Sequence, residues 1–282
     1  MKNDFVDVRS LDNFYQTSSF YPMPVILVTT LSESGVTNIG PYSLCFPFGI
    51  ADQHAMMLIS RSDSNTATNI RRTKYAALNF IPFNKQYLKN AVALGYPGQT
   101  AEKKLEESKF SLFPSQLNAD ARPQIINESV QVFECTWDAS SKFLYSGTSA
   151  ESHFLLRIEK IIMKKKWYDC LLAGKGFPSL PIDYGFRDNT KFWFSEHKAP
   201  YPEPMPKGKG TSVNTVRYQA ERIDPDIVWT EESFEKLVNI PRIFLKKALT
   251  GIVAAAKERG ITEITPEVIT EIRDKRNTEK KR

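Results

Sequence analysis

The residues best suited to chemistry lie in one polar stretch, Ser60-Arg-Ser-Asp-Ser-Asn-Thr-Ala-Thr-Asn-Ile70. Its hydroxyl and amide side chains, with a single arginine, can hold an anion such as a phosphate. An apolar run of strand length, residues 55–59, precedes the stretch, and residues 75–81 form a second run. The stretch therefore links a strand to a short helix, whose first N–H groups attract an anion. The same residue types also suit an ordinary capped loop.

Other motifs for catalysis or nucleotide binding fail on spacing. A phosphate loop at Gly174-Lys175 needs an earlier glycine where the chain has Asp169. A dinucleotide fingerprint starting at Gly174 lacks its third glycine, and no nucleophile elbow is present. The three histidines do not have metal-ligand spacing, so we predict no metal site. Because these motifs are incomplete or absent, the sequence gives little support for catalysis by the protein's own side chains.

Charge and composition indicate a globular chain with a basic end. The hydrophobic fraction of 41% and the charged fraction of 25% are ordinary for a globular protein and exclude a mainly disordered chain. The last ten residues hold six basic and two acidic side chains, which is +4 of the formal net charge of +6. The rest is nearly neutral, which gives nucleic-acid binding no support. The tail fits an acidic partner or an ordinary solvated terminus.

Cysteine usage and hydropathy favour a cytoplasmic protein. Cys45, Cys135 and Cys170 are too far apart for a Cys-x-x-Cys pair, and their odd number does not suggest a disulfide framework. The N-terminus has no apolar signal region, and no apolar run approaches the roughly 18 residues of a membrane helix. We therefore predict a reducing compartment and no membrane contact.

Short strands with brief helical interruptions dominate residues 24–165. Residues 24–30 are β-branched and apolar, 32–35 form a turn and 36–39 begin a return strand, which predicts a hairpin. Helices are expected at residues 84–95 and 100–109. Residues 129–137 and 153–163 are typical of strands. The pattern predicts a mainly β fold, an antiparallel barrel with inserted helices.

Two further regions follow the predicted barrel at 1–165. Gly and Pro recur through residues 166–225, which predicts an extended connection. Its aromatic residues Phe192, Trp193 and Phe194 suggest that part of it lies against the barrel. Residues 226–282 turn helical, and their caps, prolines and glycines predict a small three-helix domain with the basic tail.

Several ordered motifs between residues 15 and 165 resemble the flavin reductase-like family of FMN-binding split barrels. A Pro-x-Pro-Val strand at residues 22–25 ends in Thr29 and Thr30, and an Asn-x-x-Pro-Tyr-Ser turn follows at 38–43. A Thr-x-x-Asn helix start lies at residues 66–69, and the next strand carries a late asparagine at 79. The resemblance implies an antiparallel Greek-key split barrel that binds FMN.

The resemblance also implies a set of cofactor-binding residues. FMN ends in a phosphate, and Ser60, Arg61, Thr66 and Asn69 are expected to bind it. The full set is Thr29, Thr30, Asn38, Pro41, Tyr42, Ser43, Ser60, Arg61, Thr66, Asn69 and Asn79. Asp63 is unfavourable beside a phosphate, so we expect it to point outward.

Four residues near this set have two open interpretations each. Pro41 stiffens a turn whose N–H groups face the flavin ring, or a turn that needs no ligand. Tyr42 stacks on the flavin or only packs. His153 is a possible catalytic group near the flavin and nicotinamide, or a structural histidine. Cys45 is close to the turn, and we expect a small buried hydrophobe there.

The C-terminal segment resembles a second, smaller family. Residues 229–269, with Asn239-Ile-Pro241 and Ile264-Thr-Pro-Glu267, are similar to the helical domain that ends subunits of the light-independent protochlorophyllide reductase type. The resemblance implies a docking or assembly module, and it does not imply reduction of chlorophyll precursors. A helical appendage that only covers barrel or dimer surface is the alternative.

The expected function is that of a homodimeric, FMN-dependent oxidoreductase. It is expected to accept hydride from NADH or NADPH and to pass electrons to a flavin or protein acceptor, and the C-terminal helices are expected to bind a protein acceptor or assembly partner. A flavoredoxin-like electron carrier reduced by another protein is the alternative. A flavin-binding assembly protein without its own NAD(P)H activity is a further alternative.

Overall fold

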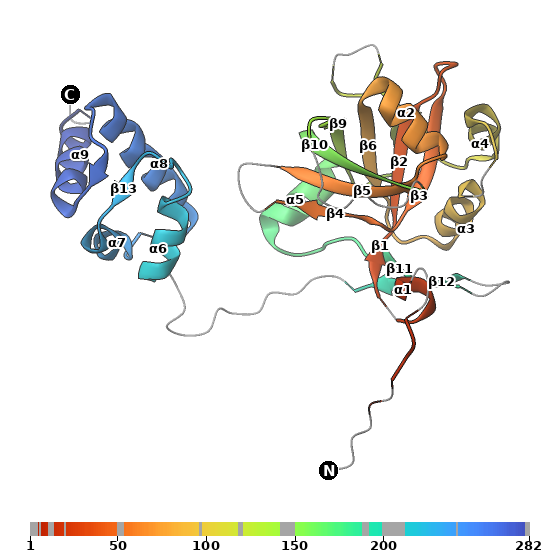
Figure 1. Ribbon diagram of the computed structural model, residues 1–282, viewed down its shortest axis with the longest axis horizontal. Helices are drawn as coiled ribbons and strands as arrows, with labels where there is room; N and C mark the ends of the chain where they lie inside the picture. Colours follow the sequence, from red (N-terminus) through yellow and green to blue (C-terminus); the bar gives the residue numbers. More distant parts are fainter. Residues whose placement is uncertain are drawn as a thin grey trace. The chain divides into compact units, whose positions relative to one another are not determined.

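The computed structural model describes residues 5, 7–10, 14–19, 21–49, 54–95, 98–117, 121–141, 150–187, 192–198, 212–240 and 242–279. The chain divides into two compact units, Met1–Tyr201 and Pro202–Arg282. Each unit has its own cluster of buried hydrophobic residues. The elements of both units are labelled in Figure 1.

A seven-stranded antiparallel sheet forms the centre of the first unit. Its strands are β2 (Ile26–Leu31), β3 (Thr37–Tyr42), β4 (Cys45–Phe48), β5 (Ala55–Arg61), β6 (Tyr75–Phe80), β9 (Gln131–Trp137) and β10 (Glu151–Met163). Their order in the sheet is β3-β2-β6-β9-β10-β5-β4. The sheet curls into a half-barrel (Figure 1), which confirms the predicted split-barrel fold.

The two faces of β2 pack against different clusters because successive side chains of a strand point to opposite faces. Ile26 and Val28 join a cluster with Ala67 and Ile70 of helix α2 (Asn65–Thr73). Leu27 joins a second cluster with residues of helix α3 (Lys85–Leu94). Helix α2 carries the chain from β5 to β6, which are not neighbours in the sheet.

Side-chain caps begin the helices of the first unit where the sequence predicts them. Asn84 accepts a hydrogen bond from Gln86 N at 2.8 Å at the start of α3. Thr100 accepts one from Lys103 N at 3.3 Å at the start of α4 (Ala101–Glu107). Both helices are confirmed, and a short helix α1 (Phe14–Thr17) lies near the N-terminus.

Residues 166–225, which were predicted to form an extended connection, include two helices and two strands among the described residues. Helix α5 (Lys165–Ala173) ends at Gly174, whose φ of 66° is the left-handed conformation that favours glycine. Strands β11 (Leu180–Arg187) and β12 (Phe192–His197) follow and pair with each other, and β11 also pairs with β1 (Met23–Pro24). Of the prolines in this stretch, Pro181 lies in β11 and Pro178 precedes it, while the prolines between residues 199 and 211 lie outside the described residues. A second small sheet pairs β7 (Leu112–Phe113) with β8 (Ile125–Ile126).

The second unit is a helical domain around a short parallel strand pair. Its elements are α6 (Val213–Ala220), β13 (Val228–Trp229), α7 (Glu231–Leu237), α8 (Arg242–Glu258), β14 (Glu263–Ile264) and α9 (Pro266–Glu279). Helices α7, α8 and α9 confirm the three expected helices. Helix α6 was missed, although Val216 and Ala220 are buried in the core of this unit. Pro241 and the basic residues 280–282 lie outside the described residues.

Candidate functional site

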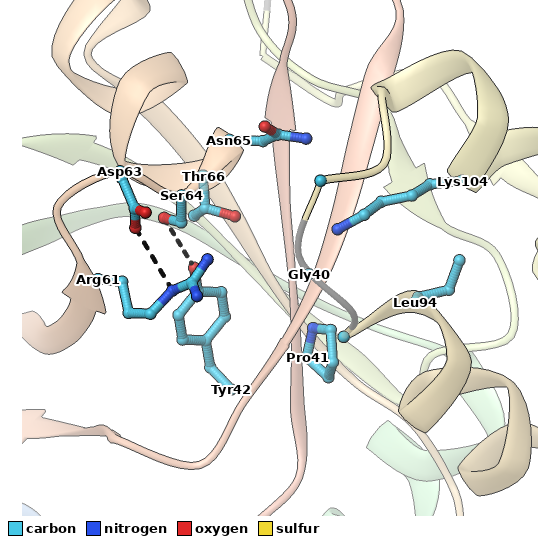
Figure 2. Close-up of a pocket in the computed structure, with 12 residues that line it drawn as sticks. Gly40, Pro41, Tyr42, Arg61, Asp63, Ser64, Asn65, Thr66, Leu94 and Lys104 are labelled. Atoms are coloured by element: carbon cyan, nitrogen blue, oxygen red, sulfur yellow. Dashed lines mark hydrogen bonds and ion pairs between the residues drawn. The ribbon is translucent and has the colours of Figure 1, made fainter.

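A pocket of about 430 Å³ lies where α2 begins beside strand β3 (Figure 2). Its walls come from the end of β3, the β5–α2 junction, the end of α3, and α4. The lining residues are Gly40, Pro41, Tyr42, Arg61, Asp63, Ser64, Asn65, Thr66, Leu94, Gly95, Gly98 and Lys104. Its volume is within the roughly 300–1,000 Å³ range of small-molecule sites.

Three hydroxyl groups form a connected set at the start of α2. Tyr42 Oη lies 2.8 Å from Ser60 Oγ, and Ser60 Oγ lies 2.8 Å from Ser64 Oγ. Ser64 is the N-cap of α2 and accepts a hydrogen bond from Ala67 N at 3.0 Å. This network fixes the Tyr42 ring at the pocket wall and leaves the first N–H groups of α2 close to the pocket.

Two cationic side chains line the pocket from separate elements (Figure 2). The Arg61 side chain is 59% exposed, and its Nε lies 3.4 Å from Asp63 Oδ1. Lys104 is only 8% exposed and comes from α4. Burial lowers the pKa of the Lys104 amine, and the nearby charge of Arg61 lowers it further. The position of both cations and the burial of Lys104 favour an anionic ligand.

The Asp63 side chain is 79% exposed, as an outward-pointing residue should be, but its carboxylate also pairs with Arg61. Figure 2 shows its carboxylate directed at Arg61 on the rim of the pocket. The guanidinium two residues earlier attracts the carboxylate, because opposite charges at this separation stabilise each other even near solvent. Asp63 therefore competes with an incoming anion for Arg61.

Buried polar residues support the pocket from behind. Asn69 Nδ2 donates to Thr30 Oγ1 at 3.1 Å, and Asn38 Nδ2 lies 3.4 Å from the Oγ1 of Thr66, which lines the pocket. Asn38 Oδ1 is buried and has no hydrogen-bond partner within the described part of the chain. Thr30, Asn38 and Asn69 thus position Thr66 and the first turns of α2, without lining the pocket themselves.

Thr29 and Asn79 lie elsewhere, deep in the sheet. Asn79 Nδ2 donates to Leu27 O at 2.9 Å and to Thr29 Oγ1 at 3.2 Å. Asn79 Oδ1 accepts from Ile126 N at 2.8 Å. Both residues are fully buried, so the structure indicates that they join β2, β6 and β8 and do not reach the pocket.

Ser43 and His153 are also separate from the pocket. Ser43 Oγ donates to Asp183 Oδ2 at 2.6 Å, which ties the end of β3 to β11. His153 lies in β10 opposite Ile59 of β5. Pro41 does line the pocket, yet it belongs to edge strand β3 and not to the expected turn. A proline is tolerated there because the outer side of an edge strand has no ladder partner.

The structure therefore brings together Pro41, Tyr42, Arg61 and Thr66 at one pocket, with Ser60 bonded to its wall. The most important residue that sequence reasoning missed is Lys104. The helix that carries it is predictable, but no local pattern indicates that this helix packs near the start of α2. Only the tertiary fold shows that Lys104 and Arg61 face the same space.

The described residues contain no candidate for a membrane-spanning helix or for a metal site. No described helix has the length and apolar character needed to cross a bilayer. Within the same residues, no group of three or more His, Cys, Asp and Glu side chains is placed to hold a metal ion.

The half-barrel with a pocket at the start of a helix can now be compared with known proteins. The family described as "Flavin reductase like domain" matches residues 18–164, so the chain belongs to this family. The match ends before the second unit, and the C-terminal resemblance stays a prediction.

Solved structures share the fold at low identity. Nitrilotriacetate monooxygenase component B from Bacillus cereus is 15% identical with a TM-score of 0.55, covering 72% of this chain and 100% of that chain. The 2-nitrobenzoate 2-nitroreductase of Pseudomonas fluorescens is 17% identical with a TM-score of 0.52, covering 67% and 88%. The FMN-binding protein from Thermus thermophilus with bound p-hydroxybenzaldehyde is 15% identical with a TM-score of 0.51, covering 72% and 100%.

Proposed function

We propose that the chain is an FMN-dependent oxidoreductase that accepts hydride from NADH or NADPH and passes electrons to a flavin or protein acceptor. The observation that carries the proposal is the pocket at the start of α2, where Arg61 and Lys104 face one space in a chain of this family. The shared fold of the FMN-binding protein from Thermus thermophilus supports FMN as the cofactor.

The pocket residues suit the terminal phosphate of FMN. Lys104 is a buried cation with no hydrogen-bond or ion-pair partner in the described residues, and a phosphate would compensate its charge. Arg61 provides forked N–H donors, and the hydroxyls of Ser64 and Thr66 lie beside the first turn of α2. Thr66, Arg61 and Lys104 would therefore hold the phosphate end.

Strand β3 shapes the remaining wall of the pocket. A Cβ on Gly40 would lie 2.9 Å from Thr66 Oγ1 and 3.1 Å from the Tyr42 ring, so glycine permits this close packing. Tyr42 is held by Ser60 and Ser64, and its ring can limit where a flat ligand lies. When bound, FMN supplies hydride acceptance and electron transfer, while the protein binds and orients it.

The test is the response of the flavin-loaded protein to nicotinamide nucleotides under anaerobic conditions. Rapid bleaching of the flavin absorbance by NADH or NADPH supports the oxidoreductase. A flavin that both nucleotides leave oxidised, but that dithionite reduces, favours the flavoredoxin-like carrier. Colourless protein that does not take up added FMN contradicts both and favours an assembly role.

The chain is also proposed to act as a homodimer. Strand β4 lies at the edge of the central sheet, and its Phe46 and Phe48 are 45% and 36% exposed. Exposed aromatic side chains on an unpaired strand edge are suited to association. Light scattering at micromolar concentration should give twice the chain mass, and the monomer mass would contradict the dimer.

The second unit is proposed as a docking module for a protein acceptor or assembly partner. Helix α8 exposes Phe244, at 57%, next to Lys246 and Lys247. An apolar side chain beside two lysines suits an acidic partner surface, and such binding weakens as salt rises. Loss of salt-sensitive partner binding on deletion of this unit is the expected result.

The cytoplasmic location remains part of the proposal. All three cysteines, Cys45, Cys135 and Cys170, are free, and the first two are buried. Free thiols are usual in a reducing compartment. Fractionation of the native cells tests the assignment, and recovery outside the cytoplasm would contradict it.

A further inference from the structure

Lys104 is unusual among the lysines that the structure describes because it is buried. Its whole residue is 8% exposed, although lysine side chains are almost always solvated. Figure 2 shows the amine directed into the pocket, between Asn65 and Pro41. No described residue hydrogen-bonds or ion-pairs with this amine. A buried cation of this kind needs an anion as its partner.

The charged groups around Lys104 do not supply that anion. Across the pocket, Arg61 adds a like charge, and Asp63 is paired with Arg61. On its own helix, Glu102 is bonded to Ser34, and Glu107 accepts from Gln99 at 3.0 Å. Lys103 and Glu106 of that helix are exposed to solvent. Two cations therefore face one pocket, with a single partly competing carboxylate at the rim.

We propose that Lys104 is a specificity-determining residue that, together with Arg61, selects a dianionic phosphate monoester. This inference rests on the proposed function for the identity of the flavin. The phosphate of FMN is such a monoester and carries a charge of about −1.5 to −2 near pH 7. Each phosphate of FAD has one ester bond and one anhydride bond and carries a single negative charge, and riboflavin has no phosphate. Lys104 thus favours FMN over both other flavins.

The pH dependence follows from the charges of both partners. The second proton of a phosphate monoester leaves near pH 6, so FMN affinity should rise from about pH 5 to 7. Burial and the charge of Arg61 lower the pKa of Lys104, so its charge is lost at a lower pH than that of an exposed lysine. FMN affinity should therefore fall again at alkaline pH. Riboflavin binding should show neither change.

The experiment compares three variants of the full-length chain stripped of flavin. Lys104→Met removes the buried charge, Lys104→Arg keeps it, and Lys103→Met removes the neighbouring exposed charge as a matched control. Fluorescence titration gives affinities for FMN, FAD and riboflavin. We expect Lys104→Met to weaken FMN binding about 10-fold to 150-fold and to abolish the alkaline fall. Riboflavin binding by this variant, and all binding by Lys103→Met, should change less than about 3-fold.

A purely structural role for Lys104 predicts that Lys104→Met lowers the melting temperature and weakens the binding of FMN and riboflavin equally. The proposed binding role predicts otherwise. Because the amine has no partner among the described residues, flavin-free Lys104→Met should melt at the same temperature as the parent or higher. Lys104→Arg should recover a large part of the FMN preference. A lower melting temperature with equal losses for FMN and riboflavin would overturn the proposal.

Inorganic phosphate separates this inference from the proposed function. At pH 8, where phosphate is a dianion, it should raise the melting temperature of the parent and of Lys103→Met, but not that of Lys104→Met. If no flavin binds the parent, the proposed function is wrong. The melting measurement with inorganic phosphate then still tests whether Lys104 binds a phosphate dianion. If FMN binds and Lys104→Met changes neither FMN nor phosphate binding, only the inference is overturned.

Discussion

Single side chains at the start of α2 have structural roles beside the pocket that we propose as the binding site. Ser64 caps the helix, and its hydroxyl also lies 2.8 Å from Ser60 Oγ in the set that holds Tyr42. Capping residues such as Ser, Asn and Thr are common in loops, so their types alone do not distinguish a cap from an anion site. The position of Arg61 and Lys104 around the same cap favours an anion site over a cap alone.

Arg61→Ala should weaken FMN binding and leave riboflavin binding nearly unchanged, because only FMN has the phosphate. The Arg61 side chain is 59% exposed and already paired with Asp63, so we expect the lower part of the range for a charged contact, about 10-fold. Titration with both flavins measures the effect. Equal losses for the two flavins would show that Arg61 acts through folding.

Asp63→Asn should have the opposite effect. The carboxylate attracts Arg61 and repels a phosphate, so its removal should strengthen FMN binding, by about 3-fold at low salt. Asp169→Asn is the matched control, since Asp169 is an exposed acid of α5 that does not line the pocket. The gain should shrink as salt rises. A loss of FMN affinity on Asp63→Asn would contradict the competing role.

Cysteine reactivity tests the burial of the core. Burial raises the pKa of Cys45 to about 12 and raises the pKa of Cys135 well above its ordinary value. A thiolate forms only as pH rises through the pKa, so neither thiol should react at pH 8, while the partly exposed Cys170 should. A thiol reagent should therefore modify one group per native chain and none in Cys170→Ser. Modification of Cys45 in the native protein would contradict the packing.

At the scale of elements, the barrel strands and their helices could be predicted from the sequence. Period-two alternation indicates β9, and the Asn84 and Thr100 caps mark α3 and α4. Burial of β2 on both faces depends on packing against α2 and α3, which local patterns do not specify. For the same reason, Thr29 and Asn79 looked like site residues, although the sheet places them in its interior.

Elements between residues 165 and 220 were harder to predict for a physical reason. Helix α5 has no buried residues, and no side-chain hydrogen bond caps its start, so it lacks the signals that marked α3 and α4. Strand β11 is stabilised by pairing with β1, more than 150 residues earlier, which is a long-range interaction. Lys104 was missed on similar grounds, because its role depends on the packing of α4 near β3.

Gly40→Ala tests the fit between strand β3 and helix α2. The added Cβ would lie 2.9 Å from Thr66 Oγ1, so the helix or the side chain must shift. We expect a loss of about 1–3 kcal/mol in the free energy of unfolding and weaker FMN binding. Adding Thr66→Ala removes the obstructing oxygen and should recover part of the stability. Unchanged stability and affinity in Gly40→Ala would contradict the close packing.

At the scale of the whole molecule, the two units have separate cores. The unit boundary falls between Tyr201 and Pro202, whereas the sequence suggested boundaries near 165 and 225. Val216 and Ala220 are buried with the C-terminal helices, and Lys257 Nζ lies 2.6 Å from Asp224 Oδ2. A cut after Asp224 would therefore remove α6 from the unit to which it belongs.

A chain ending at Tyr201 should fold and bind FMN with an affinity within about 3-fold of the full-length chain. The pocket residues all lie between positions 40 and 104, well inside the first unit. A chain ending at Asp224 should expose the apolar face of α6 and aggregate more readily. Flavin content and light scattering compare the two chains. An empty or unfolded 1–201 chain would show that the second unit is required for the barrel.

The central claim is that the pocket at the start of α2 holds a flavin by its terminal phosphate. The most direct measurement is competitive loading of the full-length, flavin-free protein with equal amounts of FMN, FAD and riboflavin, followed by removal of unbound flavin. Mass spectrometry of the released cofactor should show mainly FMN, because Arg61 and Lys104 face one anion site. Recovery of FAD or riboflavin in place of FMN, or of no flavin, would contradict the claim.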